Sequence, residues 1–245
     1  MARFGTTYDK LAVAAVVGAI AFSFATPPEV TQGNPARLFN LHLPMIAVMY
    51  VAFGVTFVAS IVYLARKALW WDHLAAAAAE VGVLFNGLTL VVGMLWAKPT
   101  WGVYWTWSAR LILTAVMFFV YLGYLALRRA IADPELRASR SAVYGILSLI
   151  QIPVIHFSVV WWRDVHQQAT LLRPDEMQID GVLFAAFLAG LVAFLMIGAS
   201  LLRRRLAVAS LEAEVERVAI AGSGGVAGDA VTPPALERRS PKVAR

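Results

Sequence analysis

Long apolar runs separated by short polar stretches dominate the chain. A helix needs about 20 apolar residues to cross a bilayer, and six runs reach or approach that length. None of them alternates polar and apolar residues with the period of two that is typical of barrel strands. Because hydrocarbon offers no partner for exposed backbone amides, we expect every run to be helical. The predicted helices are 8–25, 43–65, 74–96, 105–127, 141–160 and 181–202.

Composition agrees with this pattern. Of the 245 residues, 60% are hydrophobic and 15% are charged, whereas an ordinary soluble domain has about 25% charged residues. The sequence therefore predicts an all-α, polytopic membrane protein with a bundle of six transmembrane helices. Most lysines and arginines beside these helices, among them Arg66, Arg128 and Arg203, fall on one side. Basic loops stay in the cytoplasm, so both termini are predicted to be cytoplasmic.

This orientation predicts which loops face outward and explains the net charge. The loops near 26–42, 97–104 and 161–180 are predicted to face outward. The net charge of +6 is then mainly a topology signal, and no nucleic-acid partner is expected. We expect the first apolar run to be a retained helix, although Ser23-Phe24-Ala25 resembles a signal-peptide cleavage site. The absence of cysteine excludes disulfides, thiolate metal sites and covalent haem attachment of the C-x-x-C-H type.

Two domains are expected. Residues 1–205 form the transmembrane domain, and residues 206–245 form a cytoplasmic tail. The tail begins with a short amphipathic helix and continues as a flexible Gly-, Ala- and Pro-rich segment. Its last basic residues are either solvated or in contact with anionic membrane lipid. These residues are Arg238, Arg239, Lys242 and Arg245.

The segment WGVYWTWSARL, residues 101–111, concentrates aromatic residues between two predicted helices. An indole ring favours burial while its N–H requires a hydrogen-bond partner. A membrane surface satisfies both needs, so an aromatic belt that anchors helix ends is one interpretation. A platform for a flat ligand is the other.

Two histidines flank this segment from different outer loops, namely His42 and His166. His156 lies deeper, in the fifth predicted helix, and is either a reserve ligand or a hydrogen-bonded polar group of the bundle. His73 follows the second helix and is expected at the opposite interface. Neutral imidazole binds iron, copper or zinc. The outer pair therefore suggests a metal or metal-cofactor site, with unrelated surface histidines as the alternative.

The ligand set separates the two metal alternatives. Zinc normally takes three or four protein ligands, which would require acidic residues of the third outer loop in addition to the histidines. Haem iron takes two axial ligands, and the macrocycle is bordered by apolar and aromatic surface. Arg110 could then pair with a haem propionate. The acidic residues available for zinc are Asp164, Asp175 and Glu176.

Three motifs in order resemble the haem-handling family that carries the tryptophan-rich WWD motif, and within it the CcmC branch (cytochrome c maturation protein C). The pattern W-G-x-x-W-x-W-D-x-R-L is matched by Trp101, Gly102, Trp105, Trp107, Arg110 and Leu111. The pattern H-V-P is matched by His42, Leu43 and Pro44, with leucine in place of valine. The pattern S-V-x-W-W-x-x-x-H-Q is matched by Ser158, Val159, Trp161, Trp162, His166 and Gln167. The resemblance covers residues 37–202.

The resemblance implies a haem-binding protein of cytochrome c maturation. It implies that His42 and His166 are axial ligands of non-covalent haem b at the periplasmic face of the inner membrane. Trp101, Gly102, Trp105, Trp107 and Arg110 would border the haem, and Trp161 and Trp162 would shape the third loop. The implied partners are the haem chaperone CcmE, which receives the haem, the small membrane subunit CcmD and the ABC-type subunits CcmA and CcmB. The chain is then a transfer protein, not an enzyme.

One position departs from the family pattern. Ser108 stands where the family has its signature Asp, so a helix-capping oxygen is retained but the charge is lost. The sequence contains no G-x-x-x-x-G-K-[ST] loop, so ATP-driven steps belong to partners. Two other functions stay open: a six-helix permease for a small solute, with the tryptophans as an interfacial belt, and a b-type electron-transfer cytochrome. The cytochrome would need paired histidines within the helices.

Overall fold

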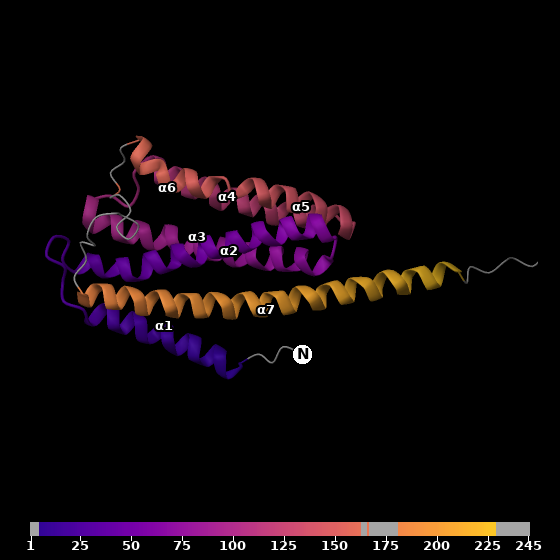
Figure 1. Ribbon diagram of the computed structural model, residues 1–245, viewed down its shortest axis with the longest axis horizontal. Helices are drawn as coiled ribbons and strands as arrows, with labels where there is room; N and C mark the ends of the chain where they lie inside the picture. Colours follow the sequence, from indigo (N-terminus) through magenta and orange to yellow (C-terminus); the bar gives the residue numbers. More distant parts are fainter. Residues whose placement is uncertain (1–4, 163–165, 167–180, 229–245) are drawn as a thin grey trace, which may run out of the picture. The chain divides into compact units, whose positions relative to one another are not determined.

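The computed structural model describes residues 5–162, 166 and 181–228, and the structural statements below refer to these residues. Their secondary structure is helical, apart from one isolated bridge between Glu29 and Gly33 in the first loop. The elements, which Figure 1 shows, are α1 (Thr7–Ala25), η1 (Asn34–Leu38), α2 (Phe39–Arg66), α3 (Leu69–Trp101), α4 (Ala109–Ala130), α5 (Pro134–Ser148), α6 (Gln151–Trp162) and α7 (Gly181–Gly228).

Six segments among these residues are long and apolar enough to cross a membrane, which confirms the predicted all-α, polytopic fold. The fifth span is built from two helices, α5 and α6, with a turn at residues 149–150 between them. Pro153 explains the break. Proline donates no backbone hydrogen bond, and its ring clashes with the carbonyl four residues earlier, which belongs to Leu149. The predicted single helix over 141–160 is therefore two helices in the structure.

Among the contacts that join α1 to α6, the one between α2 and α3 is the most extensive. A run of five buried alanines, residues 75–79, lets the two backbones approach closely. Thr56 of α2 donates its hydroxyl to the carbonyl of Ala75 across this contact, at 3.2 Å. The ring of Phe53 lies over Gly82, where any side chain would collide with it. Small residues on α3 therefore determine how the two helices pack.

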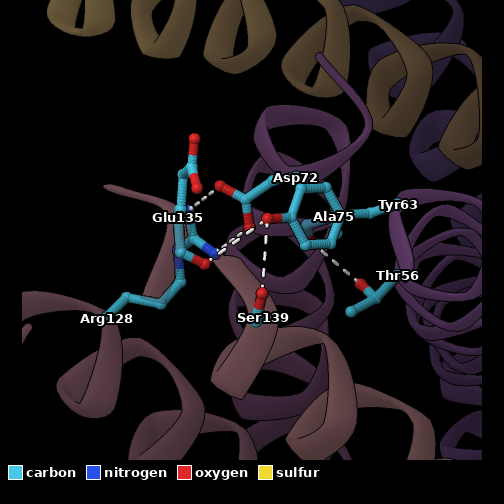
Figure 2. A network of polar contacts seen from close by, with 7 residues as sticks. All are labelled: Thr56, Tyr63, Asp72, Ala75, Arg128, Glu135 and Ser139. Atoms are coloured by element: carbon cyan, nitrogen blue, oxygen red, sulfur yellow. Dashed lines mark hydrogen bonds and ion pairs between the residues drawn. The ribbon is translucent and has the colours of Figure 1, made fainter. Parts of the chain in front are cut away.

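Polar contacts join α3 to α4 and α2 to α5 at one end of the bundle (Figure 2). Arg128 of α4 donates to both carboxylate oxygens of Asp72 in α3, at 2.5 and 2.7 Å. The hydroxyl of Tyr63 in α2 lies 3.4 Å from the carbonyl oxygen of Glu135, to which it donates, and 3.5 Å from the hydroxyl of Ser139. We call this end of the bundle the arginine end.

Helix α7 packs against α2 through two glycines. A Cβ atom added to Gly190 would lie 2.6 Å from the backbone oxygen of Asn40, and one added to Gly198 would lie 2.6 Å from Cγ1 of Val48. The Asn40 carbonyl is the one that a regular helix would bond to residue 44, which is a proline without an N–H. Glycine is therefore required where α7 crosses this carbonyl.

Three consecutive arginines of α7 also lie at the arginine end. Side chains at successive helical positions point in different directions, so each arginine meets a different neighbour. In the sequence Arg203 is part of the topology signal, and the structure adds specific contacts for the whole run. The pairs are Arg203 over the ring of Tyr8, Arg204 with Asp9 and Arg205 with Glu80.

The chain divides into two compact units, residues 1–209 and 210–245. Helix α7 begins in the first and continues into the second as far as Gly228. The sequence predicts a boundary at 205/206 and a flexible segment after a short helix, whereas the structure has one unbroken helix over Gly181–Gly228. Alanine, leucine and glutamate residues at 206–216 favour this continuation. The predicted basic tail residues, from Arg238 onward, lie outside the described residues.

Candidate functional site

His42 lies near the beginning of α2 and packs against α3. A Cβ atom added to Gly93 would lie 2.9 Å from Cε1 of His42, so glycine leaves the room that the imidazole occupies. The indole of Trp96 meets the same imidazole edge-on, with ring centroids 5.8 Å apart. The Nδ1 atom of His42 is buried and has no hydrogen-bond partner among the described residues. A neutral imidazole in this state can act as a metal ligand.

His166 lies against the last residue of α3. Its imidazole meets the indole of Trp101 edge-on, with ring centroids 4.7 Å apart. Gly93 and Trp101 are about two turns apart on α3, or roughly 12 Å along its axis. The two imidazoles lie within electrostatic range of each other, and Arg110 lies within the same range of His42. The fold therefore brings together two histidines that are far apart in the sequence. We call this end of the bundle the histidine end.

Gly102 ends α3 and sets the direction of the tryptophan segment. Its φ angle is 80°, in the left-handed region that glycine adopts without strain, and its N–H donates to the carbonyl of Lys98 at 3.0 Å. The Lys98 ammonium donates in turn to the carbonyl of Gly102, at 2.8 Å. The Trp-Gly pair of the motif is therefore a helix stop that leaves Trp101 as the last helical side chain.

The remaining tryptophans form two separate pairs. Trp105 and Trp107 meet edge-on at 6.0 Å, and Trp161 and Trp162 meet edge-on at 5.9 Å. Trp107 is 84% exposed, and both tryptophans of α6 are exposed as well. Trp105 is half-buried, and its indole N–H has no hydrogen-bond partner among the described residues. The described ring contacts do not join the five tryptophans of the motifs into one flat platform.

Arg110, the second residue of α4, links α4 to α6. Its guanidinium donates to the backbone carbonyl of His156 at 3.2 Å. The imidazole of His156 packs edge-on against Phe157, at 5.1 Å. Ser108 is the N-cap of α4, but its hydroxyl makes no capping bond and is buried without a partner among the described residues. Ser108 therefore retains the N-cap position, but its side-chain oxygen does not cap the backbone of α4.

Sequence reasoning missed the first loop, residues 26–38, as a support of the histidine end. The indole N–H of Trp96 donates to the side-chain oxygen of Gln32 at 3.1 Å. The backbone N–H of Gln32 donates to the carboxylate of Glu29, and this bond and a second one from Thr31 hold the pKa of Glu29 below its usual value. Arg37 donates to the carbonyl of Thr26. In the sequence, the glycine and tryptophan of G-M-L-W, residues 93–96, are the only hint that this part of α3 contacts other segments.

The zinc alternative requires acidic ligands from the third outer loop in addition to the histidines. Within the described ranges, no group of three His, Asp or Glu side chains lies close enough together to hold a metal ion. Asp164, Asp175 and Glu176 lie outside the described residues. The described donors are therefore two imidazoles with aromatic neighbours, a set that fits an iron porphyrin better than a bare metal ion.

Comparison with known proteins identifies the family. The family model CcmC, described as "Heme exporter protein C", matches residues 4–220. The chain belongs to the CcmC family. This match covers α1 to α6 and most of α7, and it confirms the resemblance that the three motifs carry.

Individual relatives agree with the CcmC assignment. The chain is 35% identical over 175 residues to "Heme exporter protein C" of Bradyrhizobium diazoefficiens, which covers 71% of this chain and 66% of that protein. It is 37% identical over 169 residues to the protein of the same name from Haemophilus influenzae, covering 67% and 65%. A "putative cytochrome c biosynthesis ccmC-like mitochondrial protein" of Marchantia polymorpha is 34% identical over 151 residues, covering 60% and 62%. The matched segment thus spans just under two thirds of the length of these CcmC relatives.

Proposed function

We propose that this chain binds haem at the histidine end and passes it to a partner during cytochrome c maturation. The observation that supports the proposal is that His42 and His166 both lie against the last turns of α3, beside Trp96 and Trp101, within electrostatic range of each other. The names of the CcmC relatives, which refer to heme export and cytochrome c biosynthesis, support the choice of haem. In this proposal the haem is b-type, non-covalently bound and a cargo, and the chain is a transfer protein and not an enzyme.

Each residue has a separate task in this proposal. His42 and His166 ligate the iron, and the buried Nδ1 of His42 supports this role because it lacks a competing hydrogen bond. Trp101 orients His166, and Trp105 borders the macrocycle. Arg110 pairs with a propionate while its bond to α6 holds it in place. The haem supplies the redox chemistry, and the protein supplies ligation, orientation and exclusion of water.

The proposal also assigns the faces of the membrane. The arginine end carries Arg128 and the run 203–205, so we place it on the cytoplasmic side of the inner membrane. The histidine end then lies on the periplasmic side, where the chaperone CcmE would receive haem. CcmD, CcmA and CcmB are the further partners that family membership suggests. Trp107 and the α6 tryptophans would lie at the membrane interface.

A spectroscopic experiment with cavity variants tests the ligation. The purified chain is expected to show a Soret band, and His42→Gly or His166→Gly should lower haem affinity about tenfold or more, since each 1.4 kcal/mol of lost ligation is a factor of ten. Added imidazole should restore the band, because it fills the vacated ligand position. His73→Gly, at the beginning of α3 near the arginine end, is the matched control and should leave the spectrum unchanged.

Two results would reject the proposal. The first is an unaltered Soret band in both single variants. The second is the absence of any haem band in the parent chain after haem is added, which would favour the permease function instead.

A further inference from the structure

The middle of the bundle is closed by aromatic packing. The rings of Phe53 in α2 and Tyr121 in α4 are stacked, with centroids 3.6 Å apart and planes 10° apart. Both side chains are fully buried, and the ring of Phe53 also lies against Gly82 of α3, which has no room for a Cβ atom. Met49 and Met117 are also buried in this core. A porphyrin could pass here only if α2, α3 and α4 moved apart.

A second closure lies at the arginine end. The bidentate pair of Asp72 and Arg128 joins α3 to α4, and its side chains are only 5% and 13% exposed. Tyr63 bonds to α5 beside it (Figure 2). Separating the pair would leave two uncompensated charges in a poorly solvated environment. The described core therefore carries two stacked barriers between the arginine end and the histidine end.

The exposed side of α6 differs from this closed interior. Phe157 and Trp161 are one turn apart and stack on each other, with ring centroids 5.7 Å apart, and both are about half exposed. Trp162 continues this series of exposed rings toward the histidine end. The bond from Arg110 to His156 attaches this part of α6 to the site. An apolar macrocycle dissolved in the bilayer would meet these rings before it reached the histidines.

From these observations we infer that haem reaches the histidine end sideways, from the outer half of the lipid bilayer along the aromatic face of α6, and not through the helix bundle. This inference rests on the proposed function. It assigns a guiding role to Phe157, which lies outside the three motifs, and it makes the chain a receiver of haem that another component or the lipid itself has brought to the outer leaflet.

The sequence contains no cysteine, so introduced cysteines can form disulfides only with each other. Cysteines at Val48 and Gly198 would tie α2 to α7, because the Cβ atoms would lie 3.7 Å apart, within the range of disulfides. Cysteines at Ser60 and Gly145 would tie α2 to α5, since the added Cβ lies 3.1 Å from Oγ of Ser60. The chain carrying both disulfides is reconstituted in liposomes with the histidine end uniformly outward or uniformly inward. Haemin is added outside, and loading is followed by the Soret band and by tryptophan quenching.

The expected result has two parts. With the histidine end outward, the oxidised and reduced forms should load haem at equal rates. With the histidine end inward, loading should be no faster than haem transfer across protein-free liposomes of the same lipid, in both forms. Fast loading in the inward orientation, in either the oxidised or the reduced form, would show a path through the bundle and would overturn the inference.

A substitution on α6 tests the guiding surface. Phe157→Ser should slow haem loading in the outward orientation several-fold while leaving the final Soret spectrum unchanged, because Phe157 is no ligand. Leu147→Ser is the matched control on α5: Leu147 is 60% exposed and Phe157 48%, and the control should not change the rate. Equal rates for both variants and the parent would overturn the route along α6. A parent chain that shows no haem band at all would instead reject the proposed function, and this inference with it.

Discussion

The buried pair of Asp72 and Arg128 makes the sharpest stability prediction. Asp72→Asn removes the charge that compensates Arg128 while keeping the size of the side chain. Both partners are largely buried, and the ring of Tyr124, 5.8 Å from the central carbon of the guanidinium, carries no charge that could replace that of Asp72. Breaking a buried pair from one side costs about 3–5 kcal/mol, because the remaining charge stays desolvated. Arg128→Met should lower the free energy of unfolding by a similar amount, because the Asp72 carboxylate would stay buried without a positive partner.

A double-mutant cycle separates the pair energy from the loss of each residue. The double variant Asp72→Asn/Arg128→Met leaves no buried charge behind, so it should be more stable than the sum of the single effects by about 2–3 kcal/mol. Free energies of unfolding are measured by SDS titration in mixed micelles with tryptophan fluorescence as the signal. The coupling should fall little with added salt, because the pair is shielded from solvent.

An exposed pair of the same chemistry provides the control. Glu214 and Arg217 form an ion pair on the surface of α7, with 57% and 72% of their side chains exposed. Glu214→Gln should change the free energy of unfolding by no more than about 0.5 kcal/mol, since water screens such pairs. A buried, coupled pair is contradicted if Asp72→Asn costs less than the control, or if the two single effects at Asp72 and Arg128 simply add.

Two further substitutions test the packing around the site. Gly190→Ala should lower the free energy of unfolding by about 1–3 kcal/mol in the same SDS assay, because its Cβ would lie 2.6 Å from the carbonyl oxygen of Asn40 and one helix must shift. Gly54→Ala is the control: its Cβ meets nothing within 4 Å, so the substitution should be neutral or stabilising. Equal costs for the two variants would contradict this packing. Trp96→Phe should lose the bond to Gln32, worth about 0.5–1.5 kcal/mol, and should speed hydrogen exchange of residues 26–38. Unchanged exchange there would mean that Trp96 does not hold the first loop.

Apolar length and residue type alone predict the membrane class and the six spans. A span must satisfy its own backbone, so hydropathy along one dimension is sufficient to find it. The motifs that contain Trp101 and His42 likewise identify the family without any coordinates. Helix ends were less accurate: α2 begins at Phe39, before the predicted start at 43, because amphipathic first turns carry a weaker apolar signal.

Contacts between helices depend on rotation and tilt, which a one-dimensional pattern does not contain. Arg128 counts only as a topology charge in the sequence, yet the fold turns it inward onto Asp72. The imidazole of His42 finds its place because a glycine, Gly93, faces it from α3, and no local pattern links those two positions. The break before Pro153 is determined partly by sequence and partly by tertiary structure. Proline chemistry predicts a distortion of the helix, while packing selects its position. Chain chemistry therefore determined the spans and the residues with ligand chemistry, whereas tertiary packing decided which of them meet.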